Sequence, residues 1–372
     1  MMRIGVDARE LAGHPTGVGR YLRELLQRWQ RDPACAGATL TLCSPESAAP
    51  AGLLSAGTGA RLQWHHVPGV AGTWWEQMTL PGVIASQSLD AWFAPAYTAP
   101  LRLRVPLVVA MHDVSFAAHP EWYAWRHGVR LRAVARWSAR KAARVVTLTH
   151  FSASEITRHL GVPPDRVCVV PLAVDYMDAA PAAPPSTTVP LRVLFVGSIF
   201  ERRHLPLLME GVARARQAVP DLALEVIGDN RTTPSLDFDT LAASLGLQDA
   251  FTLRAYVSDQ ELEAAYASAG AFAFLSSYEG FGLTPLEAMR HHVPVVVMDT
   301  PVAREVYGDG ARYVAPNDAG GVSEALVALL AHPDDRQAAI AAGDATVARY
   351  RWEATAGATW QVLRDVVEGR AT

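Results

Sequence analysis

Short, nearly uninterrupted apolar runs recur along the chain, and each is followed by a stretch with helical periodicity. Seven runs lie in the first half, at residues 3–8, 39–44, 62–67, 91–96, 105–112, 144–149 and 167–172. Six more lie in the second half, at residues 191–197, 224–228, 251–257, 271–276, 293–298 and 311–314. Several runs are rich in valine, which is typical of parallel strands covered by helices on both faces. The pattern predicts an α/β protein.

The two series of runs are separated by residues 178–190, which contain four prolines among thirteen residues. Such a segment favours neither a helix nor a central strand and is typical of a linker. We therefore predict two doubly wound, Rossmann-like domains, at residues 1–177 and 191–350, that face each other across a cleft. Ligands bind beyond the carboxyl ends of parallel strands, so the loops at those ends should line the cleft. Residues 351–372 predict a terminal helix.

Composition narrows the class of protein. The chain has 372 residues, of which 50% are hydrophobic, and a net charge of −4, which argues against disorder and against a nucleic-acid-binding surface. Cys35, Cys43 and Cys168 are too widely spaced for a disulfide framework or a zinc site. No run of about 18 apolar residues predicts a membrane span, and no signal-peptide pattern opens the chain. We therefore expect a cytoplasmic protein.

The strongest candidate for chemistry is residues 276–290, where a strand is followed by a glycine-rich turn and then by a helix. Backbone N–H groups at a helix N-terminus suit a phosphate oxygen or sugar hydroxyls. Glu279 precedes the turn and Glu287 lies in the first turns of the helix, so one carboxylate could hold a sugar and the other a ribose. An ordinary strand–turn–helix unit with a capping glutamate is the alternative. The main-chain donors would belong to Gly280, Phe281, Gly282 and Leu283.

The spacing of Glu279 and Glu287 resembles the E-x7-E signature of retaining, nucleotide-sugar-dependent glycosyltransferases of family 4, which have the GT-B fold. Residues 291–296 resemble the strand that follows in that family, although His292 stands where glycine is usual. The resemblance covers most of the chain, and it implies that the terminal helix at residues 351–372 crosses back onto the first domain. It implies that Glu279 acts at the donor sugar and that Glu287 and residues 280–283 bind the donor.

Two elements of the first domain extend the resemblance. Residues 16–21, Thr-Gly-Val-Gly-Arg-Tyr, look like the family's loop beside the donor phosphates, which makes Gly17 and Gly19 candidate donor-binding residues. A tight turn is the alternative for the glycines. His112 and Asp113 end an apolar run and resemble the family's His-Asp pair. The resemblance implies that His112 contacts the donor sugar and that Asp113 orients or deprotonates an acceptor hydroxyl; a buried core histidine is the alternative.

Two elements of the second domain also resemble motifs of that family. Residues 197–205 look like the family's diphosphate loop, which assigns Gly197, Arg202 and Arg203 to the donor. Arg203 replaces the usual lysine, and an arginine fork differs from a lysine point charge in its phosphate geometry. Two solvated arginines are the alternative. Residues 255–262 resemble the turn whose backbone, at Tyr256 and Val257, meets the nucleobase; a plain strand end would also explain them.

Residues 121–144 contain seven basic residues, one acid and three tryptophans. On a helix, five of the basic residues fall within an arc of about 100°: Arg126, Arg130, Arg140, Lys141 and Arg144. A basic helix with tryptophans can rest on an anionic membrane surface, as a polyprenyl-linked acceptor would require. A solvated helix face beside an acidic neighbour is the alternative.

The elements together favour a glycosyltransferase that uses no metal and no other cofactor. Residues 237–239 form the one D-x-D sequence and are interpreted as a loop. Lys141 is the only lysine and lies in the wrong half for a pyridoxal-dependent phosphorylase. The motifs look most like bacterial polysaccharide mannosyl- or rhamnosyltransferases, so GDP-mannose is the first expectation for the donor. A UDP-glucose or nucleotide-rhamnose donor, a nucleotide-sugar epimerase and an inactive nucleotide-sugar-binding scaffold remain as alternatives.

Overall fold

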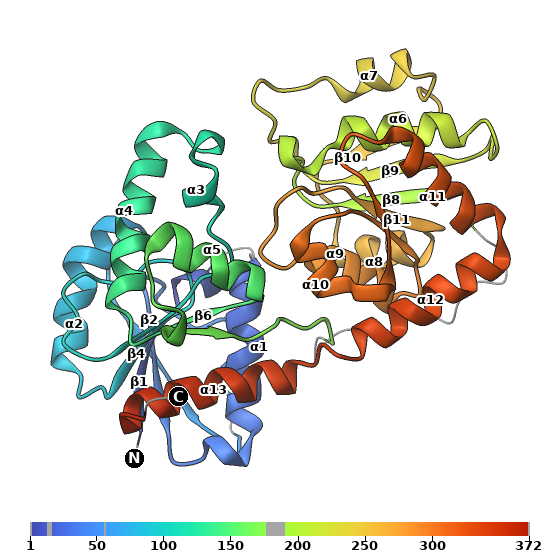
Figure 1. Cartoon of the computed structure of the whole chain (residues 1–372). Helices are drawn as coiled ribbons and strands as arrows, with labels where there is room; N and C mark the ends of the chain where they lie inside the picture. The colour runs from blue at the N-terminus through green and yellow to red at the C-terminus, as the bar shows by residue number, and fades with distance from the viewer. Residues whose placement is uncertain (1, 13–16, 56, 176–189, 371–372) are drawn as a thin grey trace. The chain divides into compact units, whose positions relative to one another are not determined.

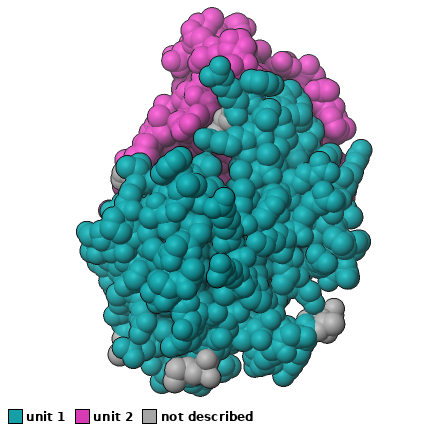
Figure 2. Space-filling model, turned by 90° about the vertical axis from the view of Figure 1, so that its left-hand side faces the viewer, with its two compact units in different colours: residues 1–177, 351–372 teal, residues 178–350 magenta. Residues whose placement is uncertain are grey.

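The computed structural model describes residues 2–12, 17–55, 57–175 and 190–370. The chain forms two compact units, coloured separately in Figure 2. Unit 1 comprises residues 1–177 together with 351–372, and unit 2 comprises residues 178–350. The chain thus enters unit 2 once and returns to unit 1 for its last helix (Figure 1).

Unit 1 is built on a seven-stranded parallel sheet with the order β3-β2-β1-β4-β5-β6-β7. The strands are β1 (Arg3–Asp7), β2 (Thr39–Ser44), β3 (Arg61–His66), β4 (Ala91–Ala94), β5 (Leu107–Ala110), β6 (Arg144–Thr147) and β7 (Val167–Val169). Strands β2 and β3 follow β1 on one side of the sheet, and β4 to β7 follow on its other side. The point between β1 and β4 is therefore the switch point at which ligands bind in such sheets.

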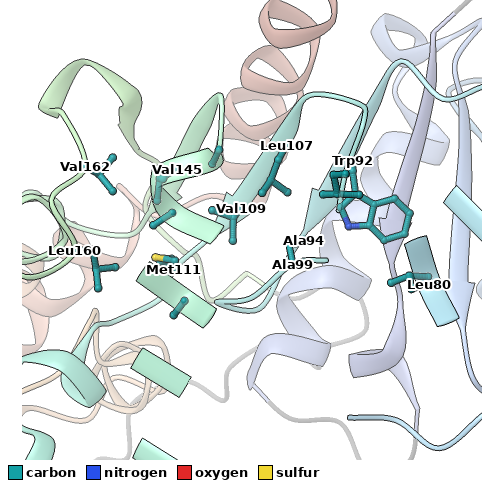
Figure 3. Packing of buried hydrophobic residues seen from close by; sticks show 14 of the residues in the cluster. Leu80, Trp92, Ala94, Ala99, Leu107, Val109, Met111, Val145, Leu160 and Val162 are labelled. Atoms are coloured by element: carbon teal, nitrogen blue, oxygen red, sulfur yellow. The ribbon is translucent and has the colours of Figure 1, made fainter. Parts of the chain in front are cut away.

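The α-helices of unit 1 are α1 (Gly17–Arg31), α2 (Leu80–Ser86), α3 (Ser115–Ala118), α4 (Trp125–Lys141), α5 (His150–Leu160) and α13 (Trp352–Glu368). Short helical turns join them: η1 (Arg9–Leu11), η2 (Pro33–Cys35), η3 (Trp75–Thr79), η4 (Pro120–Trp122) and η5 (Pro164–Arg166). Apolar side chains from the central strands, α2, α4 and α5 form one continuous core, part of which is shown in Figure 3. Burial of this surface is the main driving force for folding of the unit.

Helix α13 completes unit 1 although it lies at the far end of the sequence. The indole of Trp29 in α1 donates a hydrogen bond to the Ala356 carbonyl at 2.8 Å, and its ring lies 5.4 Å from that of Trp360. Where the chain re-enters the unit, the backbone N–H of Trp352 donates to Asp175 Oδ1 at 2.8 Å. Trp29 and Trp352 are each 1% exposed, so α13 is part of the core and not a surface addition.

Unit 2 is built on a six-stranded parallel sheet with the order β10-β9-β8-β11-β12-β13. Its strands are β8 (Arg192–Val196), β9 (Ala223–Ile227), β10 (Phe251–Arg254), β11 (Ala271–Phe274), β12 (Val295–Met298) and β13 (Ala311–Val314). Its helices are α6 (Leu205–Ala215), α7 (Phe238–Ser244), α8 (Asp259–Ala267), α9 (Leu283–Arg290), α10 (Pro301–Tyr307), α11 (Ala319–Ala331) and α12 (Pro333–Val347), with the turns η6 (Glu201–Arg203) and η7 (Gly308–Gly310). The switch point of this sheet lies between β8 and β11.

The α/β fold predicted from the apolar runs is confirmed. Each of the thirteen runs overlaps one strand, and every strand pairing is parallel. Among the described helices, none combines the length and the apolar character that are needed to cross a bilayer.

Two local assignments are wrong. Arg144 was placed on the basic helix, but α4 ends at Lys141 and Arg144 is the first residue of β6. The apolar run that it opens pairs in the sheet, and this outweighs the helical periodicity. The sequence predicts a loop for the D-x-D residues, but Asp237 caps α7, because its carboxylate accepts hydrogen bonds from the N–H groups of Asp239 and Thr240.

We predict that Trp29→Ala lowers the free energy of unfolding by about 3–5 kcal/mol, since it leaves a cavity between α1 and α13 and removes a buried hydrogen bond. Chemical denaturation followed by circular dichroism measures the change. Trp74→Ala is the matched control: this tryptophan of the same unit is 75% exposed, so its loss should cost less than about 0.5 kcal/mol. Equal effects of the two substitutions would contradict the central role of α13.

Candidate functional site

The loops that follow β8 and β11 meet at the switch point of unit 2. The carbonyl of Arg202 accepts hydrogen bonds from the N–H of Ser277 at 2.8 Å and from its hydroxyl at 3.2 Å. Arg203 Nε donates to Glu279 Oε1 at 3.1 Å, and Ser276 Oγ donates to the same oxygen at 2.9 Å. Glu279 and Arg203, predicted independently from two motifs, thus form one ion pair.

The Arg203 guanidinium is held in place on three sides. It donates from Nη1 to the Ser198 carbonyl at 2.8 Å, and it lies over the Phe274 ring at 4.9 Å from the centroid. Gly197 packs against it with φ of +131°, and a Cβ added there would lie 2.4 Å from Arg203 Nη1. The arginine is 15% exposed and its partner Glu279 is 19% exposed. The pair is therefore ordered but reachable from solvent.

Arg202 lies beside Arg203 in η6. Its guanidinium is 4.3 Å from the centroid of the Phe200 ring, a cation–π distance. The two arginines bring two permanent positive charges to the end of β8, which makes this loop suited to an anion.

The N-terminus of α9 adds main-chain donors beside the ion pair. Gly282 is the N-cap with φ of +86°, and no side chain of the described residues caps the helix. Tyr307 OH donates to the Gly282 carbonyl at 2.9 Å, and a Cβ on Gly282 would lie 2.1 Å from that hydroxyl. The buried Thr284 Oγ1 has no hydrogen-bond partner in the described part of the chain. An uncapped helix N-terminus suits a phosphate or a sugar hydroxyl.

The second glutamate, Glu287, lies in the second turn of α9 and has its own partner. Its Oε2 accepts a hydrogen bond from the hydroxyl of the buried Tyr266 at 3.1 Å. The Tyr266 ring stacks on His291, with 5.2 Å between the centroids and 3° between the planes. Burial, followed by the charge of Arg290, lowers the pKa of His291 to about 4, so this ring is neutral at neutral pH.

Tyr256 and Val257 follow β10 at the same edge of the sheet. Two strands, β9 and β8, separate β10 from β11. Tyr256 is 80% exposed and Val257 is half-buried. The structure therefore places this segment at the predicted end of a strand but does not bring it into contact with the ion pair.

In unit 1, His112 and Asp113 follow β5. His112 Nε2 is 2.9 Å from the Pro95 carbonyl, which can only accept, so this nitrogen carries the proton and Nδ1 is the free acceptor. Burial lowers the pKa of His112, which keeps the ring neutral. Asp113 Oδ1 accepts from the N–H and the hydroxyl of Ser115, at 2.8 and 2.6 Å.

The two predicted elements of unit 1 come together. Gly17 and Gly19 are the first and third residues of α1; residues 13–16 of the preceding loop lie outside the described residues. Two residues further along α1, the edge of the Tyr21 ring meets the His112 ring at a centroid distance of 4.8 Å and an angle of 83°. The start of α1 therefore lies beside the histidine.

The basic residues of α4 do not all share one environment. Arg126, Arg130 and Arg140 are exposed. Lys141 instead donates to the carbonyls of Leu101 and Leu103, both at 3.0 Å, and lies 4.7 Å from the Trp137 ring, so it anchors a loop.

Sequence reasoning missed the side chains that support the candidate residues. Ser276 stands three residues before Glu279 and could have been found as a local partner. Tyr266 and Tyr307 come from other elements, and no sequence signal connects them with the motif. No group of three or more His, Cys, Asp or Glu residues that could hold a metal ion is present in the described ranges.

Comparison with known proteins agrees with this division of the chain. Residues 15–177 match the family described as Glycosyltransferase Family 4, and residues 179–346 match Glycosyl transferases group 1. O-antigen chain mannosyltransferase B of Escherichia coli is 29% identical over 274 residues, which cover 70% of this chain and 71% of that protein. O-antigen chain mannosyltransferase RfbU of Salmonella typhimurium is 24% identical over 301 residues, which cover 74% of this chain and 81% of that protein.

The fold has a counterpart among solved structures. WaaG, a glycosyltransferase involved in lipopolysaccharide biosynthesis, superimposes with a TM-score of 0.70 at 14% identity, over 99% of this chain and 100% of that one. At this identity the likeness concerns the fold alone, and it confirms the GT-B fold that the motifs predicted.

Proposed function

The chain belongs to the family 4 glycosyltransferases, and we propose that it transfers mannose from GDP-mannose to a hydroxyl of a glycan or lipid-linked acceptor. The names of the two O-antigen mannosyltransferases support mannose and a role in cell-surface polysaccharide synthesis. The observation that carries the proposal is the Arg203–Glu279 pair beside the uncapped N-terminus of α9.

In the proposed reaction the leaving nucleoside diphosphate is stabilised by charge. Arg202, Arg203 and the N–H groups at the start of α9 meet the negative charge that develops on the diphosphate as the glycosidic bond breaks. The Arg203 guanidinium is fixed before the nucleotide sugar binds, because Gly197, Ser198 and Phe274 hold it in position. Fixed charges do not have to reorganise during the reaction, so no metal ion is required in this proposal.

The carboxylates have separate roles. Glu279 accepts hydrogen bonds from hydroxyls of the donor sugar through Oε2, since Arg203 and Ser276 both donate to Oε1. Glu287 accepts from the ribose hydroxyls, and the backbone at Tyr256 and Val257 meets the base. His112, neutral and with Nδ1 free to accept, contacts the donor sugar.

The acceptor hydroxyl meets Asp113, which orients it or takes its proton. In this proposal the acceptor hydroxyl attacks the anomeric carbon on the face from which the diphosphate departs, so the anomeric configuration is retained.

We also propose that unit 1 binds the inner face of the cytoplasmic membrane through α4. Arg126, Arg130 and Arg140 are exposed, and the same helix exposes 77% of Trp125 and 36% of Trp137. Arginines attract anionic headgroups and tryptophans favour the interface, so this helix would bring the enzyme to a lipid-linked acceptor.

We predict that Glu279→Ala lowers mannose transfer from GDP-mannose by about 100-fold, because it removes a fixed acceptor for the donor sugar. Transfer to polyprenyl-linked glycans is measured with radiolabelled donor, and thermal unfolding verifies that the variant is folded. Glu324→Ala, at an exposed position of α11, is the control and should retain full activity.

Each alternative has a distinct outcome in this experiment. Transfer from UDP-glucose or a nucleotide-rhamnose, but not from GDP-mannose, would identify that nucleotide sugar as the donor instead. Release of an isomerised sugar nucleotide would indicate an epimerase. Stabilisation against heat by a nucleotide sugar without any turnover would indicate a binding scaffold.

We predict that Arg203→Ala weakens binding of GDP by about 10- to 100-fold, since a hydrogen bond to a charged group contributes about 1.5–3 kcal/mol. Isothermal titration calorimetry measures the dissociation constant. Arg312→Ala, an exposed arginine paired with Asp335, should leave it unchanged. The same dissociation constant for both variants would argue against a phosphate contact.

Charge reversal of Arg126, Arg130 and Arg140 to glutamate should release the protein from vesicles that contain phosphatidylglycerol. Each basic residue near an anionic surface contributes about 1 kcal/mol, so loss of three weakens binding by at least about 100-fold. Cosedimentation measures the bound fraction. Reversal of Arg231, Arg304 and Arg312, which are exposed on unit 2, is the control. Equal retention of both variants would show that α4 is merely solvated.

A further inference from the structure

A strained turn lies at the switch point of unit 1, directly after β4. Tyr97 has φ of +55°, and the N–H of Thr98 donates to the Ala96 carbonyl at 2.5 Å, which closes a three-residue turn around it. A turn of this kind is rare and strained, and it is especially unfavourable for a bulky side chain. Strain of this kind persists only where the surrounding structure enforces it, and such positions cluster at functional sites.

The turn contacts both members of the His-Asp pair. Tyr97 OH donates to Asp113 Oδ2 at 3.3 Å, and the edge of its ring meets the His112 ring at 5.9 Å. Pro95, two residues earlier, accepts the hydrogen bond from His112 Nε2. The N–H of Tyr97 donates to the Ala110 carbonyl in β5 at 2.9 Å, so the turn is fixed to the strand that carries the pair.

The other end of the turn is anchored in a buried charge cluster. Thr98 Oγ1 donates to Glu76 Oε1 at 2.7 Å. Glu76 pairs with Arg9, which also pairs with Asp7 at the end of β1. Asp7 and Glu76 are each 2% exposed. A buried, paired charge is costly to expose alone, so this cluster prevents the turn from relaxing.

The two carboxylate oxygens of Asp113 have different partners, and Tyr97 in the turn bonds to Oδ2. Ser115 bonds only Oδ1, and the hydroxyl of Tyr123 lies 2.6 Å from Ser115 Oγ behind it. Tyr97 is the described residue that donates to Oδ2. The titratable groups that act on Tyr97 are Asp113, Tyr123 and Glu10, and burial followed by the Asp113 charge raises the pKa of the Tyr97 hydroxyl far above its usual value. The hydroxyl therefore stays protonated and remains a donor.

We infer that Tyr97 is a positioning residue for sugar transfer, which holds Asp113 Oδ2 toward the acceptor hydroxyl and sets the orientation of His112. The inference rests on the proposed function for the role of Asp113. It goes beyond that function because it links the transfer step to the cluster of Asp7, Arg9 and Glu76, which bears no family motif.

The test is Tyr97→Phe, which keeps the ring and removes the hydroxyl. Loss of this hydrogen bond should move the ¹³Cγ carboxylate resonance of Asp113 at fixed neutral pH. NMR of protein with ¹³C-labelled aspartate, assigned with Asp113→Asn, measures this without any turnover. In transfer from GDP-mannose to octyl α-mannoside, kcat/KM for the acceptor should fall about tenfold, while the KM for GDP-mannose stays the same.

Tyr313→Phe is the matched control, because its hydroxyl also bonds to neighbours, the Ala303 and Gly308 carbonyls in unit 2. It should alter neither the Asp113 resonance nor kcat/KM for the acceptor. If Tyr97→Phe leaves both unchanged while folded, the positioning role is wrong even if the enzyme transfers mannose. If the unchanged chain turns over no nucleotide sugar but the Asp113 resonance still moves, it is the proposed function that fails.

Discussion

The ion pair between Arg203 and Glu279 is the interaction on which the candidate donor site depends. It can form because β8 and β11 are neighbours in a parallel sheet, so their carboxyl ends deliver their loops to the same place. The pair is separated by 76 positions in the sequence, and its members come from different motifs. With Ser198 and Ser276 as further partners, it fixes both the positive and the negative part of the site before any ligand arrives.

The two units share a backbone feature at the end of their sheets but build it with different residues. Both place a residue of positive φ next to the switch point of a parallel sheet. In unit 2 such residues include Gly197 and Gly282, where a side chain would collide with Arg203 and Tyr307, respectively. In unit 1 the residue is Tyr97, where the side chain itself makes the contacts. Glycine gives room for a ligand or a cation, whereas tyrosine gives a hydroxyl at the expense of strain.

Most of the fold, and part of what the structure brings together at the candidate site, could be predicted from the sequence. Parallel strands buried on both faces leave nearly continuous apolar runs, so their positions are visible without tertiary information. Glu279, Arg203 and His112 could be found because glycine-rich turns and strand ends mark them locally. Glu76, Tyr266 and Tyr307 could not, since their partners lie 22, 21 and 25 positions away and depend on packing. Arg144 was misplaced because a basic residue fits a helix face and the start of a strand equally well.

The return of the chain to unit 1 has a consequence for biosynthesis. Trp29 packs against Trp360, so the core of unit 1 stays incomplete until residues beyond 350 have left the ribosome. Unit 2 is by then fully synthesised. Domains usually fold in the order in which they are translated, but here the later unit has all its residues before the earlier one does. A chain truncated after residue 350 would carry all residues of unit 2 but would leave the apolar face of α1 in unit 1 uncovered, a natural target for chaperones.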